Sequence, residues 1–138
     1  MGNFVLDKGC QIPTTYASSD VNGVQAFRFV RITGQGTGAP IVDRCSAITQ
    51  VPYGVVQENV DQSKVLLGKV VADVRIIGIS RVTAGAAVAI AAEVSTDTQG
   101  RAITAATTSR VSGIALQAAA AAGDQIDVLL VQAGRIVP

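Results

Sequence analysis

The chain has 138 residues and a formal net charge of +1, with 11 basic and 10 acidic side chains interspersed along it. This length suits one domain, and the scattered charge excludes the basic patch of a protein that binds nucleic acid or anionic lipid. Hydrophobic residues make up 49% of the chain and aromatic residues 4%, so its apolar mass of Ala, Val and Ile favours short strands and turns over long amphipathic helices.

Residues 1–24 show no lasting strand or helix period and are interpreted as an N-terminal arm. They lack the basic and long apolar regions of a secretory signal, and the longest apolar stretch, Ala84 to Ala92, is too short to span a bilayer. A locally packed or disordered terminus is one interpretation. The other is a segment that orders on a partner, with the anchors Phe4, Val5, Leu6, Ile12 and Tyr16.

Residues 25–138 are predicted to form a single β-rich domain. Gly34 to Pro40 is interpreted as a flexible loop, because the Lys or helix start of a phosphate-binding loop does not follow it. Many short β-branched runs with closely spaced glycine turns predict an all-β, mainly antiparallel fold, a compact β-barrel or sandwich. The predicted strands cover residues 27–32, 51–57, 65–71, 74–79, 88–94 and 126–131.

Two further local features are predicted in this domain. Leu116 to Ala122 ends in five consecutive Ala, which predicts a short Ala-rich helical turn that stops at Gly123. The sequence 53–57 and the sequence 112–117 share an order of glycine, apolar residues and glutamine, and each is followed by a connection and an apolar run. This similarity predicts two related hairpins or lobes of one barrel, with chance as the alternative, since a solenoid needs at least three copies.

Catalytic and metal-binding chemistry finds little support in the residue types. The chain contains no His, which removes the commonest general base and the Ser-His-Asp and Cys-His arrangements. Cys10 and Cys45 form no CxxC motif and have too few companions for a metal site. Two reduced packing thiols are favoured, with a Cys10–Cys45 bridge as the alternative. We therefore expect a protein that is not an enzyme and has no cofactor.

A series of short motifs lies in a definite order over residues 50–132. The series begins with Tyr53-Gly54-Val55-Val56-Gln57-Glu58, continues through Val70 to Gly78, Val82-Thr83-Ala84-Gly85-Ala86-Ala87-Val88 and Thr98 to Thr104, and closes with Val111 to Leu130.

This series resembles the small capsid decoration (cement) proteins of tailed bacteriophages, a group often mislabelled as recombinase-like. Members show a Val-x-Ala-Gly turn and a closing Gly-Ile-Ala-Leu, Ala-rich, Gly-Asp and strand signature, and they usually have a shorter N-terminus. The resemblance implies a barrel-like domain that forms a homo-oligomer, commonly a trimer. Its partner would be the major capsid protein on the outer surface of the virion, after assembly in the host cytoplasm.

Cementing requires contact area and no catalysis. Charged residues make up 15% of the chain, where about 25% is usual, and such a surface costs little to desolvate against other subunits. We expect no nucleic-acid or membrane partner, and we expect deletion of residues 2–17 to abolish capsid binding while the domain stays folded. The alternative is a β-barrel host-attachment or glycan-binding module, which the small number of aromatic residues disfavours.

Overall fold

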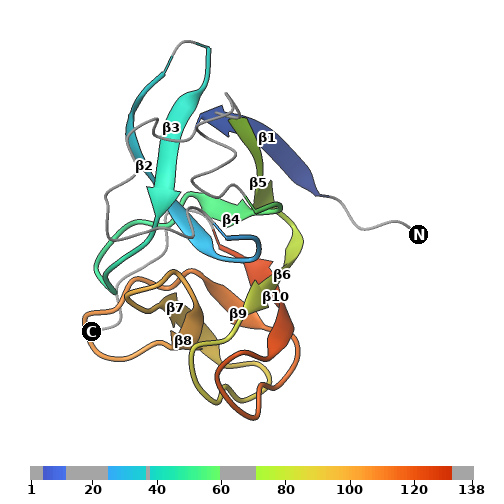
Figure 1. The fold of residues 1–138 in the computed structure, drawn as a ribbon. Coiled ribbons are helices and arrows are strands. Elements are labelled where there is room, and N and C mark those ends of the chain that lie inside the picture. The colour runs from blue at the N-terminus through green and yellow to red at the C-terminus, as the bar shows by residue number, and fades with distance from the viewer. Residues whose placement is uncertain (1–4, 12–24, 37, 60–70, 132–138) are drawn as a thin grey trace.

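The computed structural model describes residues 5–11, 25–36, 38–59 and 71–131, and these residues form ten strands and no helix (Figure 1). The all-β prediction is confirmed. None of the described residues belongs to a helix that could cross a membrane. The first five strands close into a barrel in the order β1-β3-β2-β4-β5, which we call the first lobe. They are β1 (Leu6–Gln11), β2 (Phe29–Gln35), β3 (Pro40–Arg44), β4 (Gly54–Val56) and β5 (Val71–Ile77).

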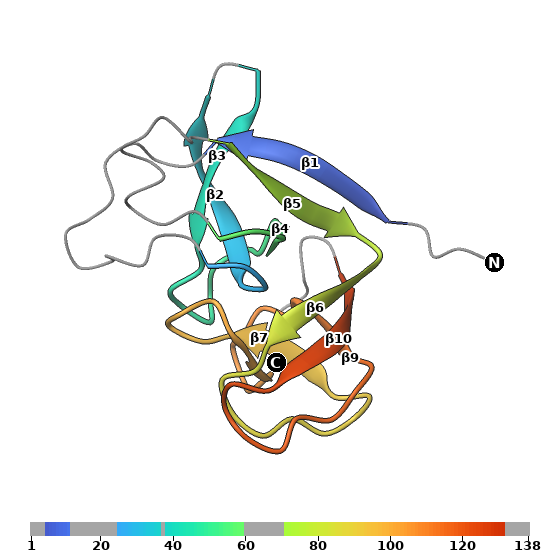
Figure 2. The same cartoon turned by 45° about the vertical axis from the view of Figure 1, so that its right-hand side comes forward.

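The other five strands form a second sheet in the order β6-β10-β9-β7-β8, which we call the second lobe. An isolated parallel bridge between Ala84 and Ala102 joins the end of β6 to the start of β8. In Figure 2 the two lobes lie one above the other, and the chain passes from β5 to β6 at Gly78. The strands are β6 (Ile79–Thr83), β7 (Glu93–Thr96), β8 (Ala102–Thr104), β9 (Gly113–Ala115) and β10 (Gln125–Leu130).

The two lobes repeat one strand topology. In the first lobe β3, β2, β4, β5 and β1 are neighbours in that order, and in the second lobe β8, β7, β9, β10 and β6 follow the same order. The closing contact is parallel in both, between Gln11 and Ile41 and between Ala84 and Ala102. The sequence similarity that predicted two related units therefore marks β4 and β9, the matching strands of a repeat that spans the fold.

The strand registers of the two lobes agree residue by residue. Val56 opposes Val74 in the first lobe, as Ala115 opposes Val128 in the second. The loop before each matching strand also agrees, because Phe27 N donates to Val56 O and Ala91 N donates to Ala115 O, both at 2.7 Å. Phe27 and Ala91 both have positive φ, 64° and 67°, a conformation uncommon outside glycine.

The interiors of the two lobes are also equivalent. Seven buried side chains form the core of the first lobe, and each has a counterpart packed inside the second. The three that come from β5, Ala72, Val74 and Ile76, occupy alternate positions, as expected where one strand face is inside and the other outside. The equivalent pairs are Cys10 and Val82, Val30 and Val94, Val42 and Ala102, Val56 and Ala115, Ala72 and Ile126, Val74 and Val128, and Ile76 and Leu130.

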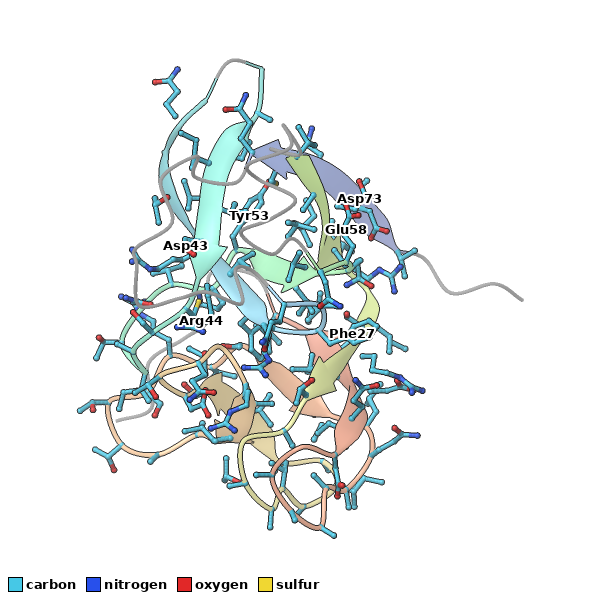
Figure 3. All side chains as sticks on the ribbon, viewed as in Figure 1. Phe27, Asp43, Arg44, Tyr53, Glu58 and Asp73 are labelled. Atoms are coloured by element: carbon cyan, nitrogen blue, oxygen red, sulfur yellow. The ribbon has the colours of Figure 1, made fainter. Side chains whose placement is uncertain are left out.

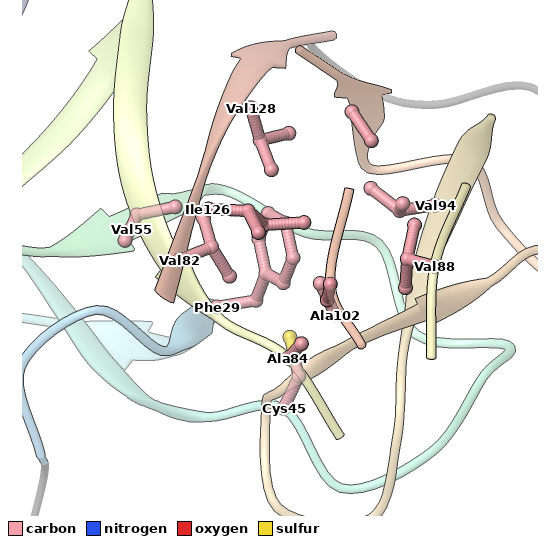
Figure 4. Packing of buried hydrophobic residues seen from close by; sticks show 12 residues of the cluster. Phe29, Cys45, Val55, Val82, Ala84, Val88, Val94, Ala102, Ile126 and Val128 are labelled. Carbon is pink, nitrogen blue, oxygen red and sulfur yellow. The ribbon is translucent and has the colours of Figure 1, made fainter. Parts of the chain in front are cut away.

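The lobes are joined because the first lobe completes the core of the second. Phe29, Cys45 and Val55 point away from their own barrel and pack in the core of the second lobe. Figure 4 shows the Phe29 ring between Val82, Ile126 and the small side chains near Cys45. Phe29 is 1% exposed and is the largest fully buried side chain among the described residues. Burial of a Phe side chain contributes about 2–3 kcal/mol, so Phe29 is a main link between the lobes.

Several sequence predictions need correction. The Ala-rich segment Leu116 to Ala122 is not helical: Ala119 is 4% exposed and bridges to Val88. Core packing and strand-like pairing at Ala119 outweigh the intrinsic helix preference of Ala. The predicted strand 88–94 overlaps the observed strand β7 only at residues 93 and 94, because β7 spans Glu93–Thr96. Residues 65–70 of another predicted strand lie outside the described residues, and Gly78 separates two strands with a φ of 101°.

The arm prediction is wrong for Leu6–Gln11, which form strand β1 of the barrel. β1 pairs antiparallel with β5 over its whole length and touches β3 at Gln11. Asp7 and Arg75 form an ion pair at 2.8 Å across this pairing. Only Cys10 of this strand is fully buried, which explains why no apolar alternation was visible. Strand β1 is part of the closed barrel, so the domain begins before residue 25.

Candidate interaction surfaces

The structure describes two of the five predicted capsid-binding anchors. Val5 and Leu6 lie at the outer end of β1 and are 38% and 40% exposed. They are free to contact a partner although Leu6 belongs to the barrel. Phe4, Ile12 and Tyr16 lie outside the described residues.

Deletion of residues 2–17 would remove all of β1. We therefore expect this deletion to unfold the domain, because β5 would lose its antiparallel partner and the barrel would open. An open barrel exposes unpaired backbone groups and core side chains. Substitution of the exposed side chains Val5 and Leu6 is the sharper test of the same anchors.

The hairpin of β2 and β3 carries a second apolar surface. It projects from the first lobe (Figure 1) and borders a shallow hollow of about 540 Å³. Ile32 at its rim is 50% exposed, and residues 33–41 include no charged side chain. The hollow is lined by Ile32, Gly34, Gln35, Gly36, Gly38, Ala39 and Pro40.

Sequence reasoning interpreted Gly34 to Pro40 as a loop and missed its role as the end of a hairpin. Strand β2 ends at Gln35 and strand β3 begins at Pro40. Their pairing has a register shift between Ile32 and Gly34. The signal that could have found the hairpin is the pair of β-branched residues Ile41 and Val42 after the glycines, because two β-branched runs around a glycine-rich turn are typical of a hairpin.

In the part of the chain that the structure describes, side chains with nitrogen and oxygen atoms are spread over both lobes (Figure 3). The backbone N–H of Asp73 donates to the carboxylate of Glu58 at 3.2 Å. Asp97 holds the β7–β8 turn, accepting from Arg101 Nε at 2.7 Å and from the backbone N–H of Gln99. Among the described residues no group of three or more acidic, Cys or His side chains could hold a metal ion.

Both cysteines are free and buried. Cys10 lies in the core of the first lobe and Cys45 in the core that the lobes share, so the alternative of a Cys10–Cys45 bridge is wrong. Burial raises the pKa of Cys45 to about 12, and the nearby Arg31 partly opposes this rise. A thiol with such a pKa stays protonated at neutral pH and acts as a packing residue.

The raised pKa of Cys45 predicts a specific alkaline destabilisation. The native state keeps the thiol proton up to about pH 12, whereas the unfolded chain loses it near the ordinary thiol pKa of 9.0. Stability that is complete below pH 9.0 is therefore lost as the pH rises towards about 12. The free energy of unfolding should fall more steeply in the native chain than in Cys45→Ala, measured by urea unfolding from about pH 7 to about pH 11. Parallel pH curves for the two proteins would contradict this.

Comparisons with known proteins agree with this fold at the level of structure. The sequence matches no protein-family model and no curated protein. One similar solved structure is the head fiber gp8.5 N base in bacteriophage phi29, with a TM-score of 0.66 and 17% sequence identity. The similarity covers 96% of this chain and 98% of that chain. The chain therefore shares its fold, over nearly its whole length, with a structural protein of a phage head.

Proposed function

We propose that the chain is a non-enzymatic structural protein of a phage virion that binds the outside of the head and cements neighbouring major capsid subunits. The observation that carries this proposal is the fold shared with a phage head fiber base over 96% of the chain. The motif series over residues 50–132, which resembles capsid decoration proteins, points independently to the same class. Residues 1–24 contribute the capsid contact through the exposed side chains of β1.

The physical properties of the surface support such a role. Val5 and Leu6 offer apolar contact area at the start of β1, a strand of the closed barrel. A barrel has no free strand edge, so it presents a rigid surface to its partner. Contacts with two neighbouring capsid subunits would both have to be broken before the subunits separate, and an oligomer would add avidity.

A glycan-binding or host-attachment module is the alternative class. Glycan sites usually present an open aromatic ring face among their polar groups. Phe29 is buried, and Phe27 and Tyr53 are half-buried, so none of these three rings offers such a platform. The capsid-binding role is therefore the better supported of the two.

The test mixes the purified chain with undecorated phage shells and measures bound copies per shell by mass. We expect copies in stoichiometric proportion to the major capsid protein, because a cement protein occupies every equivalent position. A handful of copies per particle would favour an attachment fibre or tip, and no binding would contradict the proposal.

The anchors are tested by the double substitution Val5→Ser and Leu6→Ser. Loss of two exposed apolar contacts should weaken shell binding about tenfold, which corresponds to about 1.4 kcal/mol. Val51→Ser is the matched control, since Val51 is a 47% exposed aliphatic residue between β3 and β4. Equal shell binding by the double variant and the control would exclude β1 as the contact.

A further inference from the structure

The joint between the lobes packs the side of one lobe against the end of the other. The first lobe contributes the outer face of β2, β3 and β4, from which Phe29, Cys45 and Val55 enter the second lobe. The second lobe contributes the end that carries the β7–β8 turn. Two backbone hydrogen bonds join the lobes here: Phe29 N donates to Gly100 O at 2.8 Å, and Thr83 N donates to Phe27 O at 2.9 Å. The joint is therefore heterologous, because two different surfaces meet.

The repeat gives the contacting side of the first lobe a counterpart on the second lobe. Three first-lobe positions at the joint are Val55, Gln57 and Arg75: Val55 is fully buried, Gln57 donates to Ser80 Oγ at 2.9 Å and Arg75 donates to Ile79 O at 3.1 Å. By the strand registers of the two lobes, the equivalent second-lobe positions are Ile114, Leu116 and Leu129.

Among the described residues, these second-lobe positions form a partly exposed apolar surface. Leu116 and Leu129 are 38% and 40% exposed, and Ile90 in the loop before β7 is 66% exposed. Leu129 lies directly between Ile79 and Ile114 of the neighbouring strands. We call Ile79, Ile90, Ile114, Leu116 and Leu129 the docking face. Three of its members, Ile114, Leu116 and Leu129, are the repeat equivalents of first-lobe residues that already form an interface.

The contacting end of the second lobe has a counterpart on the first lobe in the same way. Thr96, fully buried at the β7–β8 end, is equivalent by register to Ile32. Ile32 is 50% exposed, and Val71 at the start of β5 is 47% exposed at the same end of the barrel. We call Ile32, Val71 and the apolar hollow of the β2–β3 hairpin the docking end.

We propose that the docking face of one chain binds the docking end of a second copy of the same chain. The named side chains of both surfaces are apolar, with Glu93 opposite Ile114 beside the docking face. The hairpin residues 33–41 carry no charge, so desolvation of these side chains costs little. The contact repeats between chains the side-to-end packing that joins the lobes within a chain. A heterologous contact of this kind builds a ring if its rotation closes.

The first test is the oligomeric state in solution, measured by sedimentation or native mass without any shells present. We expect the full chain to be an oligomer. Leu129→Glu on the docking face and Ile32→Glu on the docking end should each raise the dissociation constant at least about tenfold. Val51→Glu, which places the same charge on an exposed aliphatic position outside both surfaces, should leave the oligomer unchanged.

The second test is a mixture of the two variants. Leu129→Glu keeps an intact docking end and Ile32→Glu keeps an intact docking face, so an equimolar mixture should form a heterodimer with one native interface. Both variants should fold, because Leu129 and Ile32 are 40% and 50% exposed. Far-ultraviolet circular dichroism of each variant checks this.

Three outcomes would overturn the inference. A monomeric wild-type chain would show that these surfaces do not bind a second copy. An oligomer that both variants leave intact would place the interface elsewhere, and a mixture without heterodimer would show that the docking face of one chain does not bind the docking end of another. The proposed function is tested separately by shell binding, so a chain that binds shells as a monomer contradicts this inference and leaves that function standing.

Discussion

Phe29→Ala should lower the free energy of unfolding by about 3–5 kcal/mol, the usual cost of truncating a buried Phe to Ala. The ring is 1% exposed and lies in the core of the second lobe although its backbone belongs to β2 of the first. Its removal leaves a cavity where the two lobes meet, so both lobes should lose stability together. Urea unfolding followed by circular dichroism measures the change.

Phe27→Ala is the matched control for this substitution. Phe27 is half-buried, and the second lobe has Ala91 at the equivalent position with nearly the same φ, 67° against 64°. An Ala at position 27 is therefore compatible with the backbone, and the loss should be well below that of Phe29→Ala. Equal losses for the two variants would contradict the role of Phe29 as the link between the lobes.

Gly113→Ala should lower the free energy of unfolding by about 3 kcal/mol through overpacking. An added Cβ would lie 2.6 Å from Leu129 O and would also collide with Val128 Cγ1. Leu129 O belongs to the backbone of the neighbouring strand β10, so the clash cannot be relieved by turning a side chain. Gly54, the equivalent position in the first lobe, has the same conflict, since its Cβ would lie 2.7 Å from Val74 Cγ1 and against Arg75 O.

Gly9→Ala is the control for the glycine substitutions. Gly9 is also a strand glycine, in β1, but an added Cβ would meet Val71 Cγ1 at an ordinary contact distance of 3.6 Å. We expect little loss of stability, measured by the same urea titration. A large loss in Gly9→Ala, or a tolerated Gly113→Ala, would show that close strand approach is not the reason for glycine at the start of β4 and β9.

The prediction of β10 is confirmed because this strand alternates between core and solvent. β10 was predicted as residues 126–131 and found at Gln125–Leu130, because Ile126 and Val128 face the core and Asp127 faces outward. The strands β8 and β9 have three residues each, too few for a period to appear. β1 was missed since Lys8 and Gly9 are exposed and its place in the barrel depends on pairing with distant residues.

The candidate surfaces were harder to predict because they depend on the relation between the lobes. Val5 and Leu6 could be named from the sequence as exposed apolar residues of the N-terminus. The sequence assigns Leu129 to a strand but does not show that it belongs to an apolar surface. Its neighbours on that surface, Ile79 and Ile114, come from distant parts of the chain. The repeat is visible in sequence at β4 and β9 alone, whereas the registers reveal it over the whole fold.

The position of β1 has a consequence for synthesis of the chain on the ribosome. Asp7 meets Arg75, 68 residues later, and contacts so far apart along a chain form slowly. The first barrel cannot close until β5 has left the exit tunnel, and the second lobe needs both Phe29 and the final strand β10. Closure of the first barrel is thus postponed until β5 has been synthesised, and completion of the second lobe is postponed until β10 has been synthesised. Until then the early strands of the nascent chain lack their partners and must avoid pairing with other nascent chains.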